Sequence, residues 1–205
     1  MTNSRLFALI FILTFKGVYA QEIKRNFAVG IYYGLGDNLG NKNYSYTSRY
    51  SKVQLSTLLK QSRNFKYQLI IQPEMDFIEY KRTSRDYYAK EYVQSTLERP
   101  SKYRSVEYIK DYSLNVGFII STPISERFSI FLLGSVGPMI TDTETERLSK
   151  GFAFSNIVSL GIAYKVCNMI VEVRPNFSHL SNGGLQKVNI GFNTRNVEFG
   201  LNYPF

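Results

Sequence analysis

Hydrophobic side chains in this sequence recur at every second residue in eight separate segments. In the last of these segments Phe199, Leu201 and Tyr203 alternate with polar or small residues. A period of two is typical of a β-strand with one apolar face. The expected strands lie at residues 27–35, 52–59, 67–77, 112–120, 128–140, 152–164, 169–178 and 196–205. Beyond residue 20 no apolar run approaches the roughly 20 residues that a membrane-spanning helix needs.

The connections between these strands are expected to alternate in length. Long ones fall at about 36–49, 80–107, 141–150 and 182–192, and short ones at 60–64, 122–126 and 165–168. Outer-membrane barrels have short periplasmic turns and longer extracellular loops, whereas a soluble sandwich has no reason to sort its loops in this way. The second face of the strands carries charged residues that suit a polar interior, namely Glu74, Asp76, Glu172, Arg174 and Glu198. The sequence therefore predicts an all-β fold, an eight-stranded antiparallel up-and-down transmembrane β-barrel.

The first 20 residues have the composition of a signal peptide. Arg5 supplies a positive charge, residues 6–15 are almost wholly apolar, and Ala20 offers a small residue for cleavage before Gln21. The apolar run is too short to cross a bilayer as a helix. We expect residues 1–20 to be removed on export and residues 21–205 to form one barrel domain in the bacterial outer membrane.

Charge and cysteine content narrow the possible partners. The formal net charge is +9, and the single cysteine, Cys167, cannot form a disulfide within the chain. Export excludes nucleic acid as a partner, so anionic lipid headgroups or lipopolysaccharide phosphates are the better candidates for a basic surface. Lysines that are merely solvated explain the charge equally well.

The residues best suited to chemistry lie at the end of the seventh expected strand. His179, the only histidine, precedes Ser181 by two residues, so both side chains project from one face, about 6.6 Å apart along the strand. They continue the series of lipid-facing residues that includes Phe177. An ionisable side chain on a lipid-facing surface is costly and suggests a function. A histidine can act as the base that a serine needs to become a nucleophile.

The residues that follow could complete an acyl-transfer site. Such a site needs hydrogen-bond donors for the developing oxyanion, and Asn182, Gly183 and Gly184 offer a side-chain amide and unobstructed backbone N–H groups. The structural alternative is that His179 belongs to an interfacial aromatic belt and that the Ser-Asn-Gly-Gly sequence only opens a turn. Lipid-facing position, adjacency to a long loop and the predicted barrel together favour the catalytic interpretation.

The sequence His179-Leu180-Ser181-Asn182-Gly183-Gly184, with Asn189-Ile190-Gly191 downstream and a final amphipathic strand, resembles the lipid A 3-O-deacylase (PagL) and acyloxyacyl-hydrolase-like family of outer-membrane enzymes. The motifs cover roughly residues 175–205. The resemblance implies an esterase that removes an ester-linked acyl chain from lipid A. It implies His179 as general base, Ser181 as nucleophile, and Asn182 with the Gly183 and Gly184 amides as the oxyanion hole. It also implies that no metal or organic cofactor is required.

One position departs from that family. The family places a glutamate two residues after the glycine that matches Gly191, where it orients the histidine, and here the residue is Asn193. An asparagine can hold an imidazole by a hydrogen bond but cannot stabilise imidazolium with a full charge. Glu198, the nearest carboxylate downstream, is expected to face the barrel interior. We therefore take Asn193 as the candidate third catalytic residue.

Three classes of function remain open at this point. The favoured one is a membrane-embedded serine esterase that acts on lipid A or a related glycolipid. The second is a non-enzymatic barrel that serves adhesion, structural support or ligand binding through the Tyr-rich loop at 81–107. The third is an acyltransferase that uses the same acyl-enzyme chemistry with a different acceptor.

Overall fold

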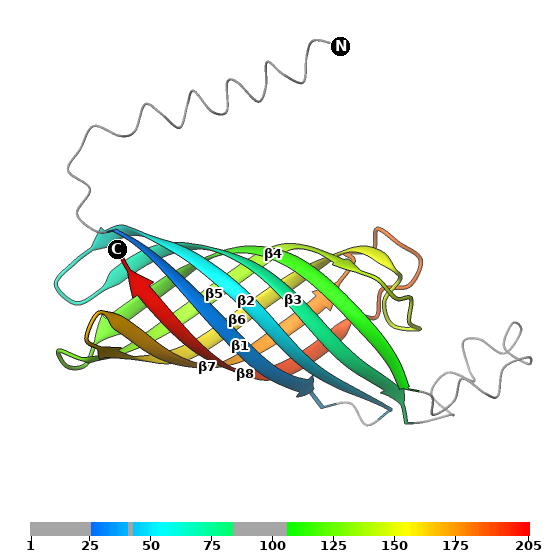
Figure 1. Ribbon diagram of the computed structural model, residues 1–205. Helices are drawn as coiled ribbons and strands as arrows, with labels where there is room; N and C mark the ends of the chain where they lie inside the picture. Colours follow the sequence, from blue (N-terminus) through cyan, green and yellow to red (C-terminus); the bar gives the residue numbers. More distant parts are fainter. Residues whose placement is uncertain (1–25, 41–42, 84–105) are drawn as a thin grey trace, which may run out of the picture.

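Eight antiparallel strands close into a single barrel in the computed structural model of this chain (Figure 1). The structure describes residues 26–40, 43–83 and 106–205, so the expected signal peptide at 1–20 lies outside the described residues. The strands are β1 (Phe27–Asn38), β2 (Tyr44–Gln61), β3 (Lys66–Arg82), β4 (Val106–Pro123), β5 (Phe128–Thr141), β6 (Gly151–Val166), β7 (Met169–Ser181) and β8 (Phe192–Pro204). Each strand pairs with its sequence neighbours, and β8 pairs with β1 to close the sheet. The expected up-and-down barrel is confirmed.

The period-two pattern separates the two faces of the barrel wall. In β1, Ile31 is 62% exposed while the neighbouring Tyr32 is 3% exposed. The same alternation runs through β8, where Phe199 faces outward and Glu198 faces inward. In β5 both faces carry apolar residues, because Phe131 and Leu133 pack inside the barrel while Leu132 lies outside. Because the sheet is closed it has no unpaired edge, and backbone groups pair between neighbouring strands. The apolar band on the outward face is the surface that suits contact with lipid.

Several strands extend beyond their expected ends. β1 and β2 continue to Asn38 and from Tyr44, so the connection between them is residues 39–43 rather than a long loop at 36–49. The prediction of strictly alternating loop lengths was therefore wrong for this first connection. The cause is that outward residues such as Thr47 and Arg49 are polar, so an apolar period of two does not mark this part of the strand. Most of the expected loop at 81–107 lies outside the described residues.

Ion pairs and aromatic rings fill the barrel interior. Lys52 Nζ lies 2.5 Å from Glu74 Oε2 and 2.8 Å from Glu198 Oε1. The Arg174 guanidinium donates to Glu172 Oε2 at 2.6 Å and stacks over the Tyr32 ring. Buried charges are tolerated when each has a partner. The expected polar interior in which carboxylates meet arginine is present.

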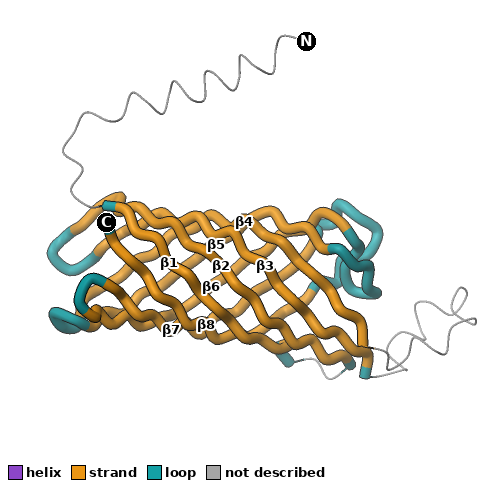
Figure 2. Tube along the Cα trace, in the orientation of Figure 1, coloured by secondary structure: helices purple, strands orange, loops and turns teal. Residues whose placement is uncertain are grey.

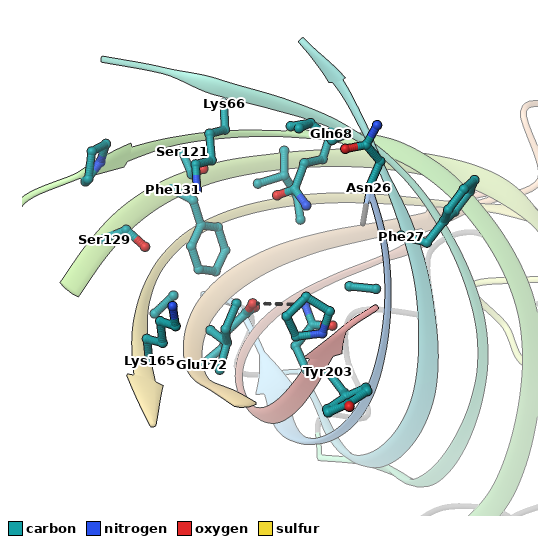
Figure 3. Close-up of a pocket in the computed structure, with 18 of the residues that line it drawn as sticks. Asn26, Phe27, Lys66, Gln68, Ser121, Ser129, Phe131, Lys165, Glu172 and Tyr203 are labelled. Atoms are coloured by element: carbon teal, nitrogen blue, oxygen red, sulfur yellow. Dashed lines mark hydrogen bonds between the residues drawn. The ribbon is translucent and has the colours of Figure 1, made fainter. Parts of the chain in front are cut away.

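The two ends of the barrel differ. The turns at 62–65, 124–127 and 167–168 lie at the same end as the C-terminus, and the loops at 142–150 and 182–191 lie at the other end (Figures 1 and 2). The interior opens at the C-terminal end into a cavity of about 420 Å³, which is lined by the exposed Lys66 and Lys165 and the buried Glu172, among others (Figure 3). No helix in the described part of the chain is long and apolar enough to cross a membrane.

Candidate active site

His179 and Ser181 lie at the C-terminal end of β7, and neither residue lines the cavity of about 420 Å³. The His179 side chain is exposed on the outer face of the barrel, and Ser181 is half-buried. Across the sheet, His179 is paired with Asn156 of β6 on one side and with Asn193 of β8 on the other. Phe177, one step further along the same face of β7, is 60% exposed. The two candidate residues therefore occupy the outward face, as their position in the alternation predicts.

Asn193 is in direct contact with the imidazole. Its Oδ1 lies 2.7 Å from His179 Nδ1. An amide oxygen only accepts hydrogen bonds, so this contact places a proton on Nδ1 and leaves the lone pair of Nε2 free to act as a base. Among the described residues no hydrogen bond joins the imidazole to Ser181 Oγ.

The two charged residues of β8 are engaged elsewhere. Arg195 forms a two-pronged ion pair with Asp37 of β1 on the outer surface, with nitrogen–oxygen distances of 2.6 and 3.2 Å. Glu198 lies inside the barrel, where it pairs with Lys52. Asn193 is thus the residue of β8 that the structure brings to the histidine.

Gly191 packs beneath the candidate pair. Its φ is +71°, in the left-handed region that favours glycine. A Cβ built on Gly191 would lie 2.4 Å from the carbonyl oxygen of Leu180, 3.4 Å from Ser181 Cβ and 3.5 Å from His179 Cε1. The loop backbone therefore lies so close to the Leu180 carbonyl, beside Ser181 Cβ and the imidazole ring, that no larger residue fits.

Two of the three expected oxyanion donors are occupied within the loop at 182–191. The buried Asn182 side chain donates through Nδ2 to the carbonyl oxygen of Val188 at 2.7 Å, and its Oδ1 accepts from Gly184 N at 3.0 Å. The backbone N–H of Asn182 donates to Asn189 Oδ1 at 2.7 Å. Asn182 therefore holds the loop together in this structure, and its expected role in the oxyanion hole stays a prediction. The Gly183 N–H is exposed and makes no hydrogen bond among the described residues.

Arg147, which the sequence pattern did not single out, supports this loop from the neighbouring one. Its Nε donates to the Gly191 carbonyl at 2.9 Å, and the Gly191 N–H donates to the Arg147 carbonyl at 2.8 Å. The guanidinium also lies over the rings of Tyr44 and Phe192, 4.5 and 5.6 Å from their centres. Arg147 and Gly191 are far apart in sequence, so no local motif reveals the contact.

Comparison with known proteins identifies the family. The model of the lipid A 3-O-deacylase (PagL) family matches residues 27–202, well beyond the 175–205 segment that carries the motifs. The chain belongs to the PagL family. A comparison with curated proteins finds no match.

Solved structures agree with this assignment at the level of the fold. The structure of the outer membrane enzyme PagL superposes with a TM-score of 0.55 at 13% identity, and it covers 84% of this chain and 97% of its own. Neisserial surface protein A superposes with a TM-score of 0.50 at 14% identity, covering 87% of this chain and 97% of its own. The chain therefore shares the closed β-barrel fold of these proteins.

The geometry of this PagL-family site suits proton transfer and nucleophilic attack. The imidazole of His179, held through Nδ1 by Asn193, and the hydroxyl of Ser181 two residues further along β7 lie on the same outward face. Within the described residues no group of three or more His, Cys, Asp or Glu side chains is arranged to hold a metal ion.

Proposed function

We propose that this chain is a serine esterase of the outer membrane that hydrolyses an ester-linked acyl chain of lipid A. Three observations support the proposal. The chain belongs to the PagL family, His179 and Ser181 share the outward face of β7, and Asn193 fixes the imidazole with its basic nitrogen free. The contact between Asn193 and His179 carries most weight, because it gives the histidine the tautomer that a general base requires.

In the proposed reaction Ser181 is the nucleophile. Rotation about its χ1 angle turns Oγ toward Nε2 of His179, which accepts the hydroxyl proton as Oγ attacks the ester carbonyl. The Gly183 N–H donates to the oxyanion of the tetrahedral intermediate, while Asn182 and Gly184 keep the loop in position. The imidazolium then returns its proton to the departing sugar oxygen, which leaves an acyl ester on Ser181.

Water completes the proposed cycle. His179 removes a proton from a water molecule that attacks the acyl-enzyme, and collapse of the second tetrahedral intermediate releases the fatty acid and restores the serine. Each step moves one proton through the imidazole and uses no group beyond the chain, the substrate and water.

We further propose that residues 1–20 are a signal peptide that directs export of the chain and is then removed. N-terminal sequencing of the protein extracted from outer membranes should then begin at Gln21. A mature chain that retains residues 1–20 would contradict this part of the proposal.

The reaction class is tested by incubating the purified barrel with lipid A in heavy-oxygen water. Hydrolysis releases free fatty acid that carries one heavy oxygen, detectable by mass spectrometry. An acyl chain found on a second lipid would instead indicate an acyltransferase. Intact lipid A after incubation with the folded barrel would favour a non-enzymatic role.

A further inference from the structure

The outer surface beside His179 contains a groove that runs across β7, β6, β5 and β4. Its volume is about 520 Å³. His179 and Asn193 line one end, Val136 and Val158 line the middle, and Phe118 lines the far end. Because neighbouring strands lie about 4.8 Å apart, the three steps from β7 to β4 give the groove a length of about 14 Å.

A single outward-facing glycine forms the floor of this groove. Gly134 of β5 is exposed on the outer face, and a Cβ built on it would meet nothing within 4 Å. In register it is flanked by Phe118 of β4 and Val158 of β6, whose side chains are 57% and 58% exposed. It is the only exposed glycine in the strands of the described residues. The missing side chain leaves a gap in the outward row formed by Phe177, Val158, Gly134 and Phe118. This row borders the groove beside the row of His179, Asn156 and Val136.

The surface on the other side of His179 is polar. Asn193 is adjacent, and the next outward row carries the Arg195–Asp37 ion pair. A glycolipid ester also has two unlike halves, a polar sugar and an apolar chain. The distribution of side chains around His179 therefore matches a substrate whose sugar lies over β8 and β1 and whose acyl chain lies over β6, β5 and β4.

From these observations we infer that the groove holds the acyl chain that is cleaved, and that Gly134 determines which chain lengths are accepted. The inference rests on the proposed esterase function. Bilayer lipid solvates an acyl chain as well as an apolar groove does, so the groove contributes position rather than hydrophobic affinity. A chain held along the groove keeps its ester carbonyl at Ser181, and small misplacements of reacting atoms are costly in rate.

The effect expected of a substitution at position 134 depends on the length of the acyl chain. Gly134 lies two strands from His179, about 10 Å away along the groove. A short chain ends before this point, whereas a long chain must pass over it. A large side chain at position 134 should therefore impair cleavage of long chains and leave short ones unaffected.

The test uses two substrates that share one glucosamine head group and differ only in the ester-linked chain, which is butyryl in one and tetradecanoyl in the other. Both are offered together to the folded barrel in detergent micelles. The ratio of long-chain to short-chain cleavage should fall by roughly tenfold or more in Gly134→Leu. Gly134→Ala should give a smaller fall in the same direction. Ser51→Leu, which adds bulk to the outer face of β2 away from the groove, should keep the wild-type ratio.

Val158→Trp provides a second way to obstruct the groove should Gly134→Leu not fold, and it should lower the ratio in the same way. An unchanged ratio in folded Gly134→Leu or Val158→Trp, with both esters still cleaved, overturns the groove assignment and leaves the esterase proposal intact. An equal fall in the cleavage of both esters also overturns the groove assignment. Failure of the wild-type barrel to cleave either ester overturns the esterase proposal and this inference together.

Discussion

At the scale of single residues, Asn193 sets this chain apart from the pattern that its family resemblance implies. Its Oδ1 contacts His179 Nδ1 at 2.7 Å, so it supplies the orientation that a carboxylate would give. It does not supply the negative charge that stabilises an imidazolium as the serine attacks. Orientation and charge can therefore be separated experimentally at this one position.

Asn193→Ala removes the orienting oxygen and should lower kcat by about tenfold to a thousandfold, because the ring can then adopt unproductive tautomers. Asn193→Glu should raise kcat and move the rising limb of the pH–rate profile to higher pH, since a carboxylate stabilises the protonated imidazole. Steady-state kinetics across pH measure both effects. If Asn193→Ala keeps the wild-type kcat and pH profile, Asn193 does not orient the base.

Gly191 is the second residue at which a small substitution should affect activity, because there is no room for one added carbon atom. Gly191→Ala places a Cβ 2.4 Å from the Leu180 carbonyl oxygen at a φ of +71°, so the loop must shift beneath His179 and Ser181. We expect a strong loss of activity and a local destabilisation of about 1–3 kcal/mol. Gly40→Ala is the matched control because Gly40 also has a positive φ but no neighbour within 4 Å. Equal activities for the two variants would mean that the close approach at Gly191 has no role in catalysis.

At the scale of elements, two loops at one end of the barrel form a single unit around the site. Leu148 and Asn189 form an isolated β-bridge, and Ser149 N donates to the Val188 carbonyl at 3.2 Å. Arg147 adds the contact with Gly191 at 2.9 Å. The loop that carries Gly183 is therefore held by the loop between β5 and β6 as well as by its own hydrogen bonds.

Arg147→Met keeps the length and apolar stem of the side chain but removes the guanidinium. A hydrogen bond from a charged group contributes about 1.5–3 kcal/mol, so the loop should loosen, kcat should fall, and the temperature at which the barrel unfolds should change little. Lys150→Met, an exposed position in the same loop, is the control and should behave as wild type. Kinetics and limited proteolysis of the loops measure the effect, and a normal kcat with normal protease resistance would rule out a positioning role.

The strands and the candidate pair were predictable from sequence for the same reason. A wall with one apolar face imposes a period of two, and that period alone predicts that His179 faces outward and Glu198 inward, where both lie. The extension of β2 up to Tyr44 was not predictable, because its outward residues there are polar. The occupied donors of Asn182 and the contact of Arg147 with Gly191 depend on which loop segments fold together, and no local pattern encodes this.

At the scale of the whole molecule, buried ion pairs connect strands across the barrel interior. Lys52 links Glu74 and Glu198, and Arg174 links Glu172 with the Tyr32 ring. Arg174 also lies 3.7 Å from Glu198. Loss of a cation leaves a buried carboxylate with fewer partners or none, which costs more than the pair itself contributes. The interior is thus a determinant of stability that lies apart from the catalytic face.

Lys52→Met should destabilise the folded barrel by about 3–5 kcal/mol, because it leaves Glu74 and Glu198 without their shared cation. Lys60→Met, at an exposed position of the same strand, should have little effect. The difference is measured by heating samples to a series of temperatures and running them on gels without boiling. The temperature at which the band of the folded barrel disappears is compared between variants. An unfolding temperature for Lys52→Met equal to that of wild type would contradict the structural role of this network.

The central claim, that Ser181 attacks the ester with His179 as its base, is tested most directly by comparing fatty acid release from lipid A among folded variants. Wild type and Ser51→Ala, which removes an outward hydroxyl from β2, should release fatty acid at the same rate. Ser181→Ala and His179→Ala should fall to the level of buffer alone while they keep the gel migration of a folded barrel. Release of the same fatty acid by Ser181→Ala at the wild-type rate would contradict the serine mechanism.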